Sequence, residues 1–214
     1  MTQSTMNRLM ITAVGALMSL AVTAQETIKL PAPDRSATNM SVMTALAQRQ
    51  SIRSFSTREL SDEQLSLLLW AANGVNRKDG RLTAPPAMNR QDIQLYVCRK
   101  DGAYSYDAAS HSLTLVSRED LRPAVAGDRQ PFVMDAPICL VVVSDQRKFG
   151  QRPARDCSCI DAGYVSQNIY LAATAMGLGT VARAMMDRER VIKGLGLVEE
   201  QLLLLNHPVG YVKE

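Results

Sequence analysis

The sequence predicts an α+β protein, and three observations lead to that class. Segments with helical period and segments with strand period mix along the chain, without the regular alternation that a doubly wound sheet requires. Asp101-Gly102 is a strong hairpin signal between two strand-like runs. No repeat, linker or shift of composition divides the chain after residue 39, so we expect one domain over residues 40–214.

Two N-terminal segments precede this domain. Residues 1–24 have the order of a secretory signal, because Arg8 precedes the uncharged run Leu9–Val22 and small residues precede a cleavage site after Ala24. The run falls short of the roughly 20 residues that span a bilayer, so an uncleaved anchor is the weaker alternative. Residues 25–39 contain two prolines and no period, which predicts an extended leader. We therefore expect an exported protein, located in the periplasm.

Charge and composition restrict the partners. The formal net charge is +3, and it falls to +2 when Arg8 is removed, since 23 basic then face 21 acidic residues. This balance favours neither nucleic-acid binding nor stable membrane insertion. A hydrophobic fraction of 46% is typical of a globular domain with a packed core.

The first expected elements are helices. Met40–Arg49 has helical spacing of its apolar positions. Ser61 and Gln64 form a capping box that opens a second helix, and leucines with helical spacing follow it as a buried face.

The middle of the chain predicts a sheet. Ile93–Arg99 alternates as a strand, and the Asp101-Gly102 turn returns the chain into Ala103–Tyr106. Ala136–Ser144 is a continuous apolar run, which indicates a central strand. Between these segments we expect a strand over Leu113–Val116 and a polar helix over Ser117–Val125.

The last third begins with a long helix, Asp161–Met176, that is small and apolar nearly all round and ends with Gly177 at the C′ position. Such a helix packs closely, either at the centre of a monomer or across a subunit interface. The remaining expected elements are a strand over Thr180–Met185, a short helix over Arg188–Gly194 and a broken strand over Leu203–Tyr211.

The four cysteines differ in context. Cys98 and Cys139 lie in strand-like apolar runs, where a buried inert thiol is the usual case. Cys157 and Cys159 have two open interpretations: they form half of a metal site, or one of them pairs in a disulfide. Since no histidine or second cysteine pair lies nearby in the sequence, we assign no metal ligands.

The segment "RQSIRSFS" suggests an anion site. Arg49, Ser51 and Arg53 occupy alternate residues, so in an extended segment they point the same way. Two guanidiniums beside a hydroxyl and backbone N–H groups match the oxygens of a phosphate. The alternative is a solvated capping turn with ordinary surface charges.

An ordered set of motifs adds to this interpretation. "RQSIRSFS" is followed by "LSDEQLSLLLWAANGVNRKDGRLTAPPA", "IQLYV", "RQPFVMDAPICLVV", "DAGYVSQNIYLAATAMGLGTV" and "HPVGY". In this order the sequence resembles the nitroreductase family of FMN-dependent oxidoreductases, and within it the branch of the peptide azoline dehydrogenases and SagB-like enzymes. The resemblance implies a central mixed sheet flanked by helices, in an interlocked homodimer with FMN at the subunit interface.

The resemblance also assigns cofactor-binding residues. The phosphate and ribityl chain match Arg49, Gln50, Ser51 and Arg53, with Arg53 nearest the pyrimidine edge of the ring. A loop given by the partner subunit matches Pro85, Pro86, Ala87 and Asn89. A strand past the isoalloxazine matches Ala182, Arg183, Ala184 and Met185. Lys213 is expected to replace the basic ligands of the C-terminal arm of typical relatives.

The implied chemistry is hydride transfer through flavin N5 between a small-molecule donor and acceptor in a ping-pong exchange. This chemistry requires no catalytic side chain, and His111 and His207 are expected to be structural. Nicotinamide cofactors are scarce outside the cytoplasm, so the donor is expected to be a quinol, a redox protein or a substrate that is itself oxidised in the reaction. Because Pro86 and Arg183 depart from the family pattern, the alternative is an exported non-catalytic flavin-binding or partner-binding protein. A structural metal protein built on Cys157 and Cys159 is a third alternative.

Overall fold

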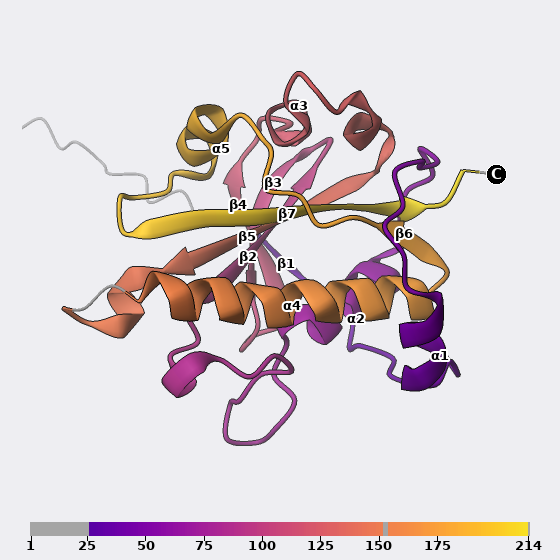
Figure 1. Cartoon of the computed structure of the whole chain (residues 1–214), viewed down its shortest axis with the longest axis horizontal. Helices are drawn as coiled ribbons and strands as arrows, with labels where there is room; N and C mark the ends of the chain where they lie inside the picture. Colours follow the sequence, from indigo (N-terminus) through magenta and orange to yellow (C-terminus); the bar gives the residue numbers. More distant parts are fainter. Residues whose placement is uncertain (1–25, 152–153, 214) are drawn as a thin grey trace, which may run out of the picture.

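A seven-stranded sheet with helices on both faces forms the body of the molecule, in a computed structural model that describes residues 26–151 and 154–213 (Figure 1). The expected secretory signal lies outside these residues. The helices are α1 (Val42–Gln48), α2 (Asp62–Asn73), α3 (Arg122–Ala126), α4 (Arg155–Ala175) and α5 (Arg188–Leu195). Figure 1 shows α2 and α4 on one face of the sheet and α3 and α5 on the other.

The strands are β1 (Thr27–Lys29), β2 (Ile93–Arg99), β3 (Gly102–Asp107), β4 (Ser112–Ser117), β5 (Ile138–Asp145), β6 (Leu178–Thr180) and β7 (Gln201–Tyr211). Their order in the sheet is β1-β4-β3-β2-β5-β7-β6. All six ladders between these strands are antiparallel, so the pairing is more uniform than the expected mixed sheet. The expected α+β class, with a central sheet flanked by helices, is confirmed.

Strand β5 explains why its sequence is apolar throughout. Leu140 and Val142 face the core beneath α2 and α4, whereas Cys139 and Val141 face the core beneath α3 and α5. Because both faces of the strand are buried, the sequence shows no alternation. The prediction of a central strand here is confirmed.

Helix α2 begins as its sequence predicts. Ser61 Oγ accepts the Gln64 N–H at 3.3 Å, and Gln64 Oε1 accepts the Ser61 N–H at 3.0 Å, so the capping box is complete. Helix α4 is 21 residues long and ends before Gly177, whose φ of +69° is the left-handed C′ conformation that glycine adopts readily.

Three expectations are corrected. The predicted polar helix Ser117–Val125 is wrong, because Ser117 still belongs to β4 and the apolar side chains of the following segment are buried in the short helix α3. The predicted strand Thr180–Met185 ends at Thr180, and beyond it only Arg183 forms an isolated bridge, to Asn206. The last strand is continuous from Gln201 to Tyr211.

The break expected within the last strand does not occur, and the sheet accommodates Pro208. Pro208 lies opposite Cys139 of β5, and its carbonyl oxygen accepts a hydrogen bond from Thr180 Oγ1 at 2.9 Å. The expected extended leader also joins the sheet, since Thr27–Lys29 pairs with β4 at the edge.

Candidate functional site

The segment after α1 is fixed across the end of the sheet. The Ile52 N–H donates to Thr180 O at 2.9 Å, and the Ser56 N–H donates to Tyr211 O at 2.8 Å. A Cβ atom on Gly179 would lie 2.7 Å from Ile52 Cγ2, so this close approach requires glycine at that position. The predicted phosphate site around Arg49, Ser51 and Arg53, called the cradle from here on, therefore has a defined place beside β6 and β7.

Tyr170 of α4 joins the cradle to the segment 182–185. Its hydroxyl accepts the Ala182 N–H at 2.9 Å and lies 2.9 Å from Ser51 Oγ, while the Arg49 guanidinium stacks on its ring at 5.0 Å. With the Ala182 N–H directed at the phenol oxygen, the phenol hydrogen is available to Ser51. Sequence analysis missed Tyr170, although a tyrosine shortly before the small residues at the end of α4 was the available signal.

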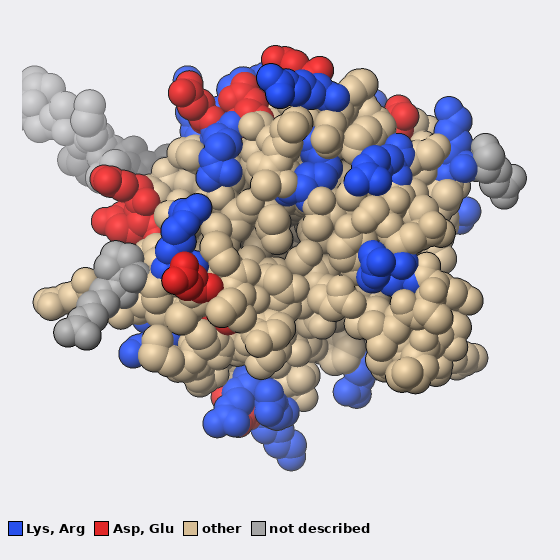
Figure 2. Space-filling model, viewed as in Figure 1, with Lys and Arg blue, Asp and Glu red and all other residues tan. Residues whose placement is uncertain are grey.

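The cationic side chains of the cradle have no carboxylate partners. None of the six ion pairs among residues 26–151 and 154–213 includes Arg49 or Arg53. Arg49 and Gln50 line a cavity of about 590 Å³ together with Thr174, Gly177 and Val212. On the face of the molecule that Figure 2 shows, Lys and Arg side chains surround a mainly uncharged centre.

Lys213 lies beside the cradle. Its N–H donates to Ser54 O at 3.2 Å, and the side chain is exposed. Unpaired cations around a hydroxyl match the donors that a phosphate monoester requires. The residues present therefore fit the phosphate end of FMN.

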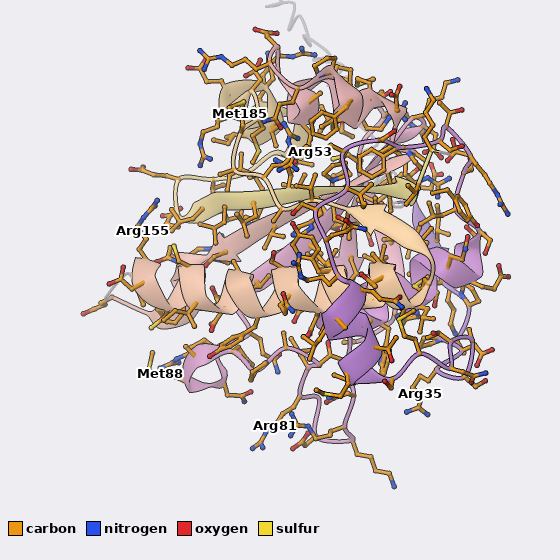
Figure 3. The ribbon with its side chains drawn as sticks, turned by 45° about the vertical axis from the view of Figure 1, so that its right-hand side comes forward. Arg35, Arg53, Arg81, Met88, Arg155 and Met185 are labelled. Atoms are coloured by element: carbon orange, nitrogen blue, oxygen red, sulfur yellow. The ribbon has the colours of Figure 1, made fainter. Side chains whose placement is uncertain are left out.

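Segment 182–185 divides its side chains between two environments. Ala184 and Met185 are exposed, whereas Arg183 is buried and points toward α3. Figure 3 shows Arg53 and Met185 on the same side of α4. Ala184 and Met185 are thus accessible to a ligand beside the cradle, but the Arg183 side chain is not.

A buried neutral histidine supports this region. Thr180 Oγ1 donates to Pro208 O, so it accepts from His207 Nδ1 at 3.1 Å, and His207 Nε2 then accepts from Ser166 Oγ at 2.9 Å. Burial lowers the pKa of His207 to about 3. The side chain is therefore neutral near pH 7 and packs edge-on against the Tyr170 ring, as a structural residue.

The loop that carries Pro85, Pro86, Ala87 and Asn89 lies elsewhere. The Ala87 N–H donates to both Oδ atoms of Asp161, each at 2.9 Å. Asp161 precedes Tyr170 by nine residues on α4, which is roughly 14 Å along the helix axis. Figure 3 shows Met88 of this loop on the side of α4 opposite to Arg53. One subunit therefore does not bring all the predicted residues together.

The buried Asp161 carboxyl, which holds this loop, has a second buried carboxyl, that of Asp92, as its neighbour. Asp92 Oδ2 accepts from Ser144 Oγ, and Asp92 Oδ1 has no hydrogen-bond partner among the described residues. Burial raises the pKa of Asp161 to about 6; the Ala87 N–H opposes this shift, and the Asp92 carboxyl reinforces it. Met88 and Asn89 adopt left-handed φ values of +51° and +53°, which are uncommon for side chains such as methionine. Sequence analysis identified neither aspartate.

The cysteines do not form a second site. Cys98 lies opposite Cys139 in adjacent strands, and burial raises the pKa of Cys139 to about 12. In α4, Cys157 is half-buried and Cys159 exposed. The described residues contain no group of three or more His, Cys, Asp or Glu side chains suited to a metal ion. Among them, too, no helix is long and apolar enough to cross a membrane.

Comparisons with known proteins identify the family and the fold. The model described as "Nitroreductase family" matches residues 46–211. A protein of Methanocaldococcus jannaschii whose name includes "nitroreductase" is 31% identical over 197 residues, covering 86% of this chain and 97% of its own. A crystal structure described as a nitroreductase from Ralstonia eutropha JMP134 is 35% identical, with a TM-score of 0.82, and the match covers 90% of this chain and 92% of that one.

A further similar structure contains a ligand. It is described as a nitroreductase in complex with FMN from Desulfovibrio desulfuricans, and it is 23% identical to this chain with a TM-score of 0.62. The match covers 83% of this chain and 89% of that one. At this identity the likeness shows the shared fold.

Proposed function

This chain belongs to the nitroreductase family, and from that premise we propose that it is an FMN-dependent oxidoreductase. The observation that carries the proposal is the pair of guanidiniums, Arg49 and Arg53, that have no carboxylate partner in the described chain and flank Ser51 beside the open segment 182–185. When bound, FMN supplies hydride transfer at N5 between a donor and an acceptor, in a ping-pong exchange.

The residues of this chain would bind and orient the cofactor. Arg49, Gln50 and Ser51 would hold the phosphate and ribityl chain, with Lys213 as a further cation. Arg53 would lie at the pyrimidine edge of the ring. The exposed backbone at Ala184 and Met185 would face the reactive part of the ring, and no side chain here is assigned a proton-transfer role.

A homodimer is part of the proposal, because the loop 85–89 lies at the other end of α4 from the cradle. A two-fold axis that packs α4 against its copy in antiparallel fashion would bring the loop of one subunit to the cradle of the other. An exposed apolar face supports this arrangement. Val42 and Met43 of α1 are 67% and 74% exposed, and Ile160 and Tyr164 of α4 are 54% and 46% exposed.

Location and subgroup are proposed on sequence grounds. We propose export through residues 1–24, supported by their signal-like order. We also place the chain in the azoline dehydrogenase and SagB-like branch, supported by the ordered motifs from "RQSIRSFS" to "HPVGY". Outside the cytoplasm the donor would be a quinol, a redox protein or a substrate that is itself oxidised in the reaction.

Cofactor retention tests the proposal. The mature protein, residues 25–214, is incubated with FMN and passed through gel filtration, and its visible spectrum is recorded. We expect about one FMN per chain, and at least a tenfold loss of affinity in Arg49→Ala and Arg53→Ala. The first variant loses a charge-assisted phosphate contact, and the second loses the cation at the pyrimidine edge of the ring. Arg77→Ala is the control, because Arg77 is exposed and bonds only Asn76. Equal FMN retention in all three variants would contradict the assignment.

The second candidate function is a flavin-binding protein without turnover. Pro86 favours it, because a proline offers no side-chain hydrogen bond to the ring at a position where many relatives have hydroxyls. The discriminating measurement is the reoxidation of dithionite-reduced protein by quinones or nitroaromatics. Reoxidation faster than that of free FMN supports the enzyme, and reoxidation no faster than that of free FMN supports the non-catalytic protein.

A further inference from the structure

Arg183 is a buried cation without a carboxylate partner. Only 6% of the residue is exposed, and its guanidinium donates to Gln130 Oε1, Val125 O, Ala126 O and Asn206 Oδ1, which are all neutral oxygens. No ion pair of residues 26–151 and 154–213 includes it. Its hydrogen bonds are satisfied, but its charge is not neutralised.

A second buried arginine in the same layer, by contrast, has a carboxylate partner. Arg122 of α3 is 9% exposed, and Asp120 binds it through a 2.8 Å ion pair. Burying an arginine next to a carboxylate leaves the region neutral, whereas burying one among carbonyls leaves a full positive charge in a medium of low dielectric constant. The guanidinium keeps its proton because its intrinsic pKa is above 12.

The residue that carries this charge adjoins the proposed cofactor site, although its guanidinium points toward α3. Arg183 is the residue between Ala182, whose N–H is bonded to Tyr170, and Ala184, which is exposed. Salt screens charges at the surface strongly and charges in the interior weakly. The field of Arg183 at the open side of segment 182–185 therefore persists at ionic strengths that screen an exposed arginine such as Arg53.

We propose that Arg183 is a positioning residue that sets the reduction potential of the bound flavin, an inference that rests on the proposed function. Two electrons from the donor and one proton convert the neutral oxidised ring into a reduced ring with one negative charge. A fixed positive charge nearby stabilises that product and leaves the neutral oxidised form almost unaffected. Arg183 thus favours binding of the reduced cofactor without touching it.

The alternative role is a structural one, in which Arg183 only fastens α3 and η2 (Pro131–Asp135) to β7. The two roles are separated by a variant that keeps the contacts and removes the net charge. Gln130→Glu places a carboxylate beside the guanidinium at the position of the present Gln130 contact. Arg183→Gln removes the charge together with several contacts, and Arg183→Lys keeps the charge but loses the planar fork.

The experiment measures the midpoint potential of FMN bound to each variant, by spectroelectrochemical titration at low and high salt. In Gln130→Glu and Arg183→Gln we expect a more negative potential and a loss of preference for reduced over oxidised FMN on the order of tenfold, at both salt concentrations. Arg183→Lys should remain near the wild-type potential. Gln130→Asn is the control, because it changes the contact without adding charge.

Two results would overturn the inference. One is a wild-type potential in Gln130→Glu, and the other is the same shift in Gln130→Asn as in Gln130→Glu. If Arg183→Gln does not fold, Gln130→Glu still decides the question. FMN binding with an unchanged potential defeats only this inference, whereas failure of the wild-type protein to retain FMN defeats the proposed function as well.

Discussion

The two ends of α4 hold their parts of the candidate site by different chemistry. At the Tyr170 end, hydroxyls, backbone groups and the neutral His207 connect the cradle to segment 182–185. At the Asp161 end, a buried carboxyl that neighbours the Asp92 carboxyl holds the loop 85–89. Burial lowers the pKa of His207 and raises that of Asp161, so the two ends respond to pH with opposite sign.

This difference shows how one helix can serve two halves of a site. The Tyr170 end keeps its protonation state at pH 7, whereas the Asp161 end titrates close to neutrality. The ends are far apart within one subunit, and the proposed homodimer would combine them. The predictions below test the chemistry of each end and then their combination.

The largest expected effect is at the Tyr170 end, on acidification. The ordinary pKa of a histidine in the unfolded chain is 6.5, whereas that of folded His207 is about 3. The stability that neutral His207 contributes is therefore fully present above pH 6.5 and is lost as pH falls. Between pH 7 and pH 4 it amounts to about 3 kcal/mol of unfolding free energy. Urea unfolding of the wild type and of His207→Gln across this range should show that difference; parallel curves would contradict it.

At the Asp161 end the sign is reversed. The ordinary pKa of this carboxyl is 3.8 and the folded value is about 6, so its contribution is present below pH 3.8 and is lost as pH rises through 6. We expect a loss of about 2 kcal/mol between pH 4 and pH 7. Asp161→Asn keeps an acceptor for the Ala87 N–H and should remove this dependence in the same unfolding series. Retention of the full dependence in the variant would show that another group causes it.

The link between cradle and segment 182–185 is tested by Tyr170→Phe. Removing the hydroxyl leaves the Ala182 N–H without its acceptor, which should cost about 1–2 kcal/mol. FMN affinity should fall several-fold, because Ser51 loses its neighbour. Tyr104→Phe is the matched control, because the Tyr104 hydroxyl bonds Asp101 at the turn between β2 and β3, outside the cradle and the proposed dimer face. Equal stability and FMN retention in the two variants would argue against the role of Tyr170.

The combination of the two ends is tested by Ile160→Glu. Since Ile160 is exposed, the unfolding free energy of a monomer should change by no more than about 0.5 kcal/mol. A charge on the proposed dimer face should nevertheless give monomers in sedimentation equilibrium, and FMN should be lost with the partner's loop. Val198→Glu, at a second exposed apolar residue, should leave the dimer intact. A dimer that persists in Ile160→Glu would place the interface elsewhere.

Local signals in the sequence were sufficient for several elements. The bounds of β2, the capping box of α2, the hairpin turn at Gly102 and the end of α4 at Gly177 follow the predictions closely. Each depends on residues that are neighbours along the chain, such as a side chain that bonds the backbone three residues later. The cations of the segment "RQSIRSFS" are likewise close together in the sequence, and their role as a phosphate cradle stays a prediction.

The tertiary structure decided which distant groups meet. Tyr170 contacts Ser51 from 119 residues away, and Asp161 contacts Ala87 from 74 residues away. The direction of the Arg183 side chain was also beyond the sequence, since it depends on carbonyls of α3. Burial determines the pKa of His207 and of Asp161, and burial is a property of the packed molecule. The sequence thus determined the local elements, whereas packing decided their supports and their charge states.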